Sequence, residues 1–271
     1  MKIAIVGGGI AGLVSGWLAA EAGHEIEVFE RDRLGSGASG KALGVLVPIT
    51  GLDRPVDILQ RAGIAAWPEM AVRLGAASGI AVEDFWRDWG NSRQQVRLPM
   101  VFEVLRLAIE AKGGFVHEGT EVTSPALLRE RFDRVVLAAG LGNMALAGVG
   151  MKVSAGVACR LVGTLHKLVA GDNLFVAPDW DGTVIAGSVN WEMKEAGDGA
   201  VPEPKLSELS GRIGTLVPEL AGVKVVEAWV GYRPVEVPRL PLVRDLGDGV
   251  LAVVGLGKVG IGLAPMIKVW E

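Results

Sequence analysis

The chain has 271 residues, half of them hydrophobic, with a formal net charge of −4 and a single cysteine. The acidic balance and the lack of a basic stripe argue against nucleic acid as a partner, and the composition indicates a buried sheet rather than a disordered chain. Because Cys159 has no second cysteine with which to form a disulfide or a metal cluster, we expect a reducing, cytoplasmic location and no bound metal.

The first thirty residues predict a βαβ unit that binds a dinucleotide. We expect a buried strand over residues 1–6, a helix that ends at about Glu21, and a second strand over residues 25–29. Glu30 follows this second strand, at the place where a carboxylate takes the ribose hydroxyls of an adenosine. A dinucleotide-binding site requires a strand, a helix, a second strand and an acidic residue in this order, and the first thirty residues supply all four.

Glycines between the first strand and the helix have the G-x-G-x-x-G spacing. Gly7 permits the tight turn, Gly9 lets the backbone approach a pyrophosphate, and Gly12 allows close packing of the helix on the strands. The first helical residues, Ile10 and Ala11, would then present unpaired N–H groups and the positive end of the helix dipole to the phosphates. This motif alone does not distinguish NAD from FAD.

The remainder of the first half mixes helical and strand patterns. Pro68 predicts a bend or a new helix inside the second helical segment, since proline lacks an N–H group. The predicted elements are a loop of small and polar residues over 31–44, an apolar run over 45–49, a helical pattern over 56–78, a helix over 99–112, and strands over 115–122 and 134–138.

After about residue 152, strands alternate with turns. An Asp-Gly pair at 181–182 between two apolar runs predicts a β-hairpin. The predicted elements are strands over 174–178 and 183–189, a helix over 205–216, a strand over 223–230, a strand over 250–254, a glycine loop, and a helix from about 261. Two apolar stretches, 3–20 and 250–263, are interrupted by glycine; neither predicts a spanning helix, and peripheral contact with a membrane is left open.

Several separated segments together resemble one family, and they follow one another in that family's order. The segments are Gly7–Gly16 with Glu30–Arg31, Ser36–Gly44, Val135–Gly140, Val176–Pro178 with Asp181–Gly182 and Gly187–Ser188, Gly231–Pro234, and Gly255–Ile261. The chain is thereby identified as a member of the D-amino-acid oxidase superfamily of FAD-dependent oxidoreductases, and it looks most like the glycine/sarcosine oxidase branch. The resemblance spans nearly the whole chain and is unspecific for the substrate.

The resemblance implies an α/β fold in which a Rossmann-like FAD-binding domain of the GR2 type is interleaved with a smaller substrate domain built on an antiparallel sheet. We expect residues 1–50, 99–150 and 246–271 in the FAD-binding domain, and residues 51–98 and 151–245 in the substrate or cap domain. It also implies non-covalent FAD. The expected cofactor-binding residues are Gly7, Gly9, Ile10, Ala11, Gly12, Glu30, Arg31, Ala38, Ser39, Leu43, Gly44, Val45, Val122, Ala139, Gly140, Gly257, Lys258, Val259, Gly260 and Ile261.

Two residues are the expected catalytic groups. In the family, the arginine of Gly-x-Arg-Pro pairs with the substrate carboxylate, which makes Arg233 the expected anchor. The family's final loop faces the N1 and C2 carbonyl of the flavin, so Lys258 is expected to stabilise the negative charge of the reduced flavin. Tyr232 would point to the opposite face of a strand from Arg233, and we expect it outside the pocket.

The implied function is oxidation of the C–N bond of a small amino acid or N-substituted amino acid, that is, of a small amine that bears a carboxylate. Hydride passes to the flavin N5 and water hydrolyses the imine. The electron acceptor stays open between oxygen and another compound. None of the three histidines is assigned a catalytic role.

Departures from the family pattern keep a second hypothesis open. Leu256 and Val259 stand where the family has histidine and asparagine, and the segment between Leu46 and Pro99 is much shorter than is usual. An incomplete cap would mean a small open pocket, walls supplied by a partner subunit or a second copy of the chain, or lost activity. The alternative is therefore an FAD-binding subunit of a larger heteromeric dehydrogenase, or a scaffold inactive alone. A third hypothesis, an NAD(P)-dependent dehydrogenase, accounts for the motif in the first thirty residues but not for the final glycine loop or for Gly-x-Arg-Pro.

Overall fold

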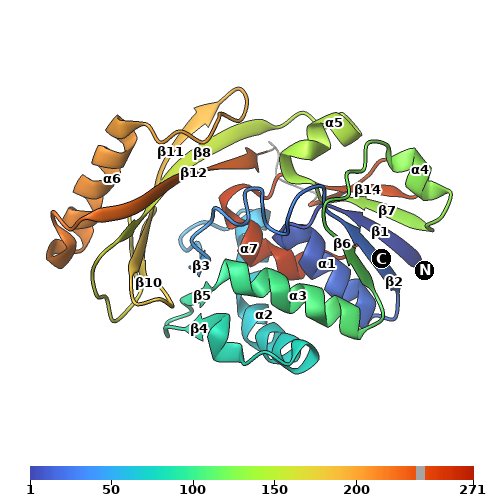
Figure 1. Cartoon of the computed structure of the whole chain (residues 1–271), viewed down its shortest axis with the longest axis horizontal. Helices are drawn as coiled ribbons and strands as arrows, with labels where there is room; N and C mark the ends of the chain where they lie inside the picture. The colour runs from blue at the N-terminus through green and yellow to red at the C-terminus, as the bar shows by residue number, and fades with distance from the viewer. Residues whose placement is uncertain (236–241) are drawn as a thin grey trace.

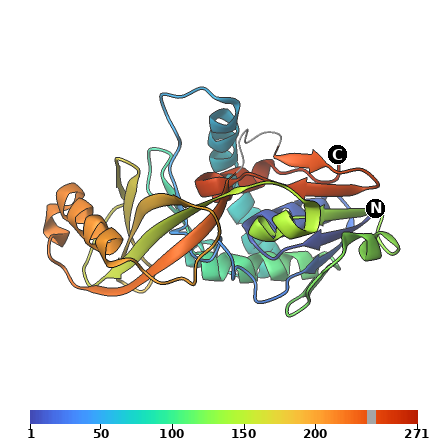
Figure 2. The ribbon, with the colours of Figure 1, turned by 90° about the horizontal axis from the view of Figure 1, so that it is seen from above.

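The structure, a computed structural model, describes residues 1–235 and 242–271. Within these residues the strands form a six-stranded sheet, a five-stranded sheet and a three-stranded sheet (Figure 1). The six-stranded and five-stranded sheets lie side by side along the long axis of the molecule in both views (Figure 2). Residues 236–241, which belong to the segment predicted as substrate domain, lie outside the described residues.

The six-stranded sheet confirms the predicted Rossmann-like unit. Its strands are parallel except for the antiparallel pair of β13 and β14. In spatial order they are β13 (Val243–Asp245), β14 (Val250–Val253), β7 (Arg134–Leu137), β1 (Lys2–Val6), β2 (Glu25–Phe29) and β6 (Phe115–His117). The strand predicted over residues 115–122 ends at His117, so Val122 lies in the loop that follows it.

Successive side chains of β1 point to opposite faces of this sheet, and both faces are buried. Ile3 and Ile5 pack in one core with the first three helices, whereas Ala4 and Val6 pack in a second core on the other face. The first three helices are α1 (Ile10–Glu21), α2 (Pro55–Ser78) and α3 (Leu98–Ala111), and the short helices α4 (Pro125–Arg129) and α5 (Asn143–Ala147) lie with the second core. Burial on both faces explains the near-continuous apolar runs of the sequence.

Helix α2 continues through Pro68, so of the two predicted alternatives, a bend or a new helix, the new helix is wrong. A proline in a helix leaves the carbonyl four residues earlier without its usual N–H partner. Here that carbonyl belongs to Ile64, and the buried side-chain amide of Gln94 donates a hydrogen bond to it at 3.2 Å. A side chain from another part of the chain therefore satisfies the acceptor that proline frees, and the helix needs no break.

The C-terminal turns pack closely on α2. Gly63 lies against the C-terminal helix α7 (Gly260–Leu263), because a Cβ on Gly63 would stand only 1.9 Å from the carbonyl oxygen of Gly262. Thus α2, although it comes from the segment predicted as substrate domain, shares the core of the parallel sheet with α1 and α3. The exact division of the chain into two domains stays a prediction.

Gly63→Ala should lower the free energy of unfolding by roughly 1–3 kcal/mol, because the added methyl group meets rigid backbone. Gly211→Ala in helix α6 (Glu203–Leu216) is the matched control, since a Cβ there meets nothing within 4 Å and alanine favours the helix by about 0.5–1 kcal/mol. Denaturant unfolding of the two variants measures both changes. Equal stabilities would contradict the close approach of α2 and α7.

The five-stranded antiparallel sheet forms the other half of the molecule. Its strands, in spatial order, are β12 (Val225–Val235), β8 (Lys152–Leu161), β11 (Val184–Met193), β10 (Leu174–Pro178) and β9 (Val169–Gly171). Helix α6 covers one face, where Leu209 and Ile213 pack with Val157 and Cys159. The predicted hairpin is confirmed by the antiparallel pairing of β10 and β11.

Strand β12 differs from its prediction, which ended the strand at Val230. It continues through Gly231–Pro234 and stays paired with β8 as far as Val235. Pro234 is compatible with this because β12 is an edge strand, and an edge strand tolerates proline at positions whose nitrogen faces away from the neighbouring strand. Arg233 therefore projects from a regular strand rather than from a loop.

The small three-stranded sheet joins the two halves. It contains β3 (Val45–Leu46), β5 (Gln94–Val96) and β4 (Trp86–Asp88), and β4 follows the 3-10 turn Val82–Asp84. Gln95 donates a hydrogen bond at 3.1 Å to the carbonyl of Pro178 in the hairpin. Within residues 1–235 and 242–271, none of the helices is long and apolar enough to cross a membrane.

Candidate functional site

A cavity of about 980 Å³ lies between the parallel sheet and the antiparallel sheet. Sixteen of the predicted site residues line it: Gly7, Gly9, Ile10, Ala11, Glu30, Arg31, Ala38, Ser39, Val122, Ala139, Gly140, Arg233, Gly257, Lys258, Gly260 and Ile261. The other five, Gly12, Leu43, Gly44, Val45 and Val259, are not among the lining residues. Segments far apart in the sequence thus meet around one space.

The N-terminus of α1 opens into this cavity. Gly7 has φ +117° and lies so close to β7 that a Cβ would be 2.5 Å from the carbonyl oxygen of Ala138. Gly9 has extended backbone and precedes the helix, and the N–H of Ile10 donates to the Ser39 hydroxyl at 3.1 Å. A side chain on Gly9 would enter the space beside Ser39, which fits the narrow approach that a pyrophosphate needs.

Gly12 does not line the cavity, and its role is to permit close packing. A Cβ on this residue would stand 2.1 Å from the carbonyl oxygen of Gly7 and 3.2 Å from the Ile5 side chain. It therefore allows the helix to lie against β1 and keeps the turn at Gly7 in place, without itself facing the cavity.

Glu30 stands at the end of β2 and is held by two backbone N–H groups. One carboxylate oxygen accepts from Gly8 at 2.7 Å and the other from Asp32 at 3.0 Å. The neighbouring Arg31 forms a hydrogen-bonded ion pair with Asp32, which raises the pKa of the guanidinium. The oriented carboxylate at the cavity wall fits the ribose end of an adenosine.

The loop over residues 36–44 passes from the cavity to the antiparallel sheet. Ala38 and Ser39 line the cavity. Further on, Gly44 has φ +72° and a Cβ there would stand 1.9 Å from the Val96 carbonyl oxygen, while Val45 pairs with Gln95. The end of the loop, from Leu43 to Val45, is therefore held on the small sheet and on β11, which explains why these residues do not line the cavity.

The final loop brings Gly257, Gly260 and Ile261 to the cavity, and the Trp67 indole donates to the carbonyl of Ile261 at 3.0 Å. Val259 instead packs in the main core. The helix predicted from about residue 261 is only the four-residue α7, so its dipole contributes little.

Lys258 is exposed at the cavity wall. Its ammonium group donates to the side-chain oxygen of Asn173 at 2.9 Å, which links the final loop to the turn between β9 and β10. The role of Lys258 toward the flavin stays a prediction.

Arg233 reaches from β12 across β8 to β11. Its guanidinium donates to the side-chain oxygen of Asn190 at 2.6 Å and to the Ser188 hydroxyl at 3.3 Å. Gly156 of β8 lies underneath, since a Cβ on that residue would be 2.5 Å from one guanidinium nitrogen. Among the described residues no carboxylate forms an ion pair with Arg233, and burial lowers the pKa of its guanidinium.

The face of the sheet that carries Arg233 is the one that meets the loop over residues 36–44. A Cβ on Gly231, two residues away on the same face, would contact Lys41 at 3.0 Å. The Trp229 indole also donates to the Lys41 carbonyl at 2.8 Å. Tyr232 was expected outside the pocket, yet it lines the cavity too, because the loop over residues 196–199 extends the cavity around β12 and Gly199 donates to its hydroxyl.

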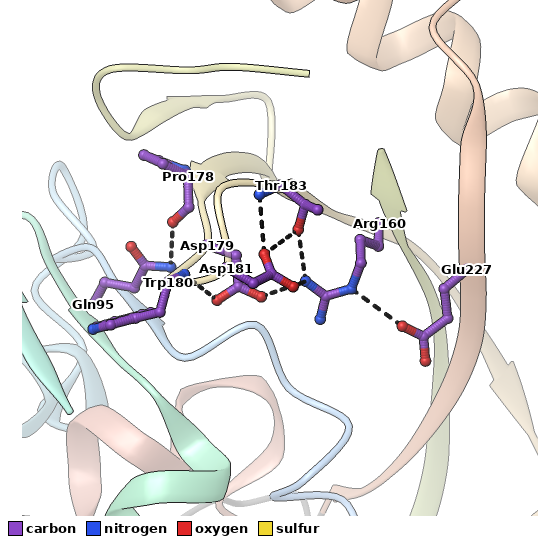
Figure 3. A network of polar contacts seen from close by, with 8 residues as sticks. All are labelled: Gln95, Arg160, Pro178, Asp179, Trp180, Asp181, Thr183 and Glu227. Atoms are coloured by element: carbon purple, nitrogen blue, oxygen red, sulfur yellow. Dashed lines mark hydrogen bonds and ion pairs between the residues drawn. The ribbon is translucent and has the colours of Figure 1, made fainter. Parts of the chain in front are cut away.

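A second polar cluster near the cavity is structural. Arg160 of β8 forms ion pairs with Asp179 at 2.6 Å, Asp181 at 3.0 Å and Glu227 at 3.2 Å, as Figure 3 shows. Thr183 completes the network by accepting from Arg160 and donating to Asp181. One guanidinium thus ties the tip of the β10–β11 hairpin to β12, and Glu227, which lines the cavity, is already paired.

Sequence reasoning missed Asn190 and Gly156, and it named Ser188 only as part of a family segment. Ser188 and Asn190 lie two residues apart in an apolar strand, which is a signal that polar groups share one face. The register shift between Gly187 and Val189 weakens this signal, because a bulge alters the alternation. The position of Gly156 opposite Asn190 requires the strand pairing itself.

Comparison with known proteins agrees with this geometry. A model of the DAO family, described as FAD dependent oxidoreductase, matches residues 2–93 and 87–268. Glycine oxidase of Geobacillus kaustophilus is 24% identical over 97% of this chain and 90% of its own length. Its crystal structure has a TM-score of 0.81, at 22% identity, over 98% of this chain and 92% of that one.

Other solved structures share the fold. Glycine oxidase from Bacillus cereus ATCC 14579 has a TM-score of 0.83 at 18% identity, over 98% of this chain and 92% of that one. Iminodiacetate oxidase from Chelativorans sp. BNC1 has a TM-score of 0.78 at 17% identity, over 97% of this chain and 92% of that one. The family model covers nearly the whole chain, and the glycine turn, the oriented acid and the shared cavity agree with it, so this chain belongs to the DAO family of FAD-dependent oxidoreductases.

Proposed function

We propose that the protein oxidises the C–N bond of a small amino acid or N-substituted amino acid, and that the product imine is hydrolysed by water. Bound FAD supplies the hydride acceptor for this chemistry. The similarity to glycine oxidases and to an iminodiacetate oxidase supports a substrate in which an amine lies next to a carboxylate.

One observation carries the proposal: Arg233 is a half-buried cation on the cavity wall that has neutral partners instead of a carboxylate. A buried charge without a counter-charge is costly, and a bound anion offsets that cost. A planar guanidinium suits a carboxylate because it can donate two parallel hydrogen bonds. In this role Arg233 would bind the substrate carboxylate and thereby fix the direction of the adjacent C–H bond.

The other lining residues are proposed to hold the cofactor. The N-terminus of α1 with Gly9 and Ser39 would take the pyrophosphate, and Glu30 would take the ribose hydroxyls. Gly257 and Gly260 would bring the final loop close to the flavin ring. Lys258 is proposed to act there through its positive charge rather than through proton transfer.

An anaerobic absorbance titration of the FAD-loaded protein tests the function. Small amino acids and N-methyl amino acids are added in turn, and we expect one class to bleach the flavin absorbance. Hydrogen peroxide on admission of oxygen would identify an oxidase, and its absence a dehydrogenase. A flavin spectrum that no compound bleaches would favour the alternative of a subunit that needs a partner.

A further inference from the structure

The two partners of Arg233 are an amide and a hydroxyl, and both come from β11. The amide is fixed on both sides, because the Asn190 oxygen also accepts from the Ser188 hydroxyl at 2.9 Å and the Asn190 nitrogen donates to the Ser188 carbonyl at 3.3 Å. The Ser188 hydroxyl can then accept from Arg233 while it donates to Asn190. The three side chains form a closed set of hydrogen bonds.

The choice of an amide at this position has an electrostatic consequence. An aspartate has the same shape and could accept the same hydrogen bond from Arg233, but it would also neutralise the guanidinium. Asparagine accepts the same hydrogen bond from Arg233 but brings no negative charge. The positive charge of Arg233 therefore stays available for an anion in the cavity.

The strand underneath fixes where the guanidinium lies. Gly156 is paired with Asn190 on one side and with Gly231 on the other, so it sits at the centre of the three-strand segment. A Cβ on Gly156 would stand 2.5 and 2.9 Å from the two terminal guanidinium nitrogens and 2.6 Å from the Asn190 oxygen. The lack of a side chain at this position lets Arg233 lie flat against the sheet and reach β11.

We propose that Asn190 and Ser188 are positioning residues that hold Arg233 in a fixed orientation and leave its charge uncompensated, so that strands β12, β8 and β11 form a preformed clamp for one carboxylate. This inference rests on the proposed function, in which Arg233 binds the substrate carboxylate. It adds that Asn190 sets the affinity for the anion through its neutrality, not through contact with the anion.

Asn190→Asp tests the clamp, with benzoate as an anionic probe and benzamide as its neutral counterpart. Binding to the FAD-loaded protein is followed by calorimetry and by the change in flavin absorbance. At pH 7.5 the variant should bind benzoate about 10- to 100-fold more weakly than the original protein, because the introduced carboxylate pairs with Arg233. Benzamide binding should not change, because benzamide carries no charge that the introduced carboxylate could repel.

Two further variants separate charge from structure. Asn91→Asp makes the same chemical change in an exposed turn of the β4–β5 hairpin, and it should leave benzoate affinity unchanged. Gly156→Ala displaces the guanidinium without adding charge, so it should weaken benzoate binding at pH 7.5 as well. Unchanged benzoate affinity in Asn190→Asp, or equal weakening for benzamide, would overturn the inference. Equal benzoate affinity in the original protein and in Arg233→Ala would instead overturn the anchor on which the inference rests.

Discussion

Replacing Arg233 with alanine should raise the KM for carboxylate substrates by roughly 30- to 4,000-fold, since loss of one partner of a buried charged pair costs about 2–5 kcal/mol. The guanidinium combines positive charge with neutral hydrogen-bond partners on the cavity wall. FAD should stay bound, because Glu30 and the turn at Gly7 and Gly9, which we propose to bind it, belong to the parallel sheet rather than to the sheet that carries Arg233. Steady-state kinetics and the ratio of flavin to protein measure the two effects.

The matched control for this experiment is Arg212→Ala. Arg212 lies on α6, which covers the other face of the antiparallel sheet, and its side chain donates to the carbonyl of Asp172. This variant removes an arginine from the same half of the molecule without touching the cavity, so its KM should equal that of the original protein. Unchanged kinetics in Arg233→Ala would exclude Arg233 as the substrate anchor.

The parts of the site that could be predicted from the sequence are those in which local sequence determines local structure. The turn at Gly7 and Gly9, the helix that follows and the acid at Glu30 lie within thirty residues, and each is where its pattern predicted it. The hairpin was predictable for the same reason, because the Asp-Gly pair that forms the turn stands in the sequence between the two strands that the turn joins.

Features that depend on distant pairing were not predictable. Asn190 meets Arg233 only because β8 lies between their strands, and the two residues are 43 positions apart. By the usual rule Pro68 bends a helix or starts a new one, but here the helix continues, and Gln94 supplies the missing donor to the Ile64 carbonyl from 30 positions away. The role of Asn190 or Gln94 depends on a residue far away in the sequence, so no pattern among its neighbours in the sequence reveals it.

The distinction between lining and supporting residues also depends on packing. Leu43, Gly44 and Val45 lie in or next to a segment that resembles the cofactor loop of the family, yet their contacts are with β5 and β11. A family motif marks a segment as near the site, whereas the direction of each side chain is set by the elements packed against it. For that reason the motif over residues 36–44 indicated the segment but not which of its residues line the cavity.

Gly9→Val should remove FAD binding while the protein stays folded. The backbone of Gly9 has φ −80° and ψ 175°, a conformation that any residue can adopt, so the substitution strains no turn. Its side chain would project toward Ser39, where a Cβ already stands 3.1 Å from the hydroxyl, and would fill the approach to the N-terminus of α1. Because the backbone N–H groups there would lose contact with the pyrophosphate, we expect FAD affinity to fall by about 100-fold or more.

The measurement is the flavin absorbance per protein after reconstitution with FAD, together with the melting temperature with and without added FAD. In the original protein FAD should raise the melting temperature, because a ligand that binds only the folded state stabilises it. Gly9→Val should show no such shift, although it should still unfold cooperatively without FAD. Gly16→Ala is the control on the same helix, since a Cβ there makes only ordinary contacts of 3.5–3.7 Å and lies outside the cavity. Full retention of FAD by Gly9→Val would contradict the assignment of this helix N-terminus as the pyrophosphate site.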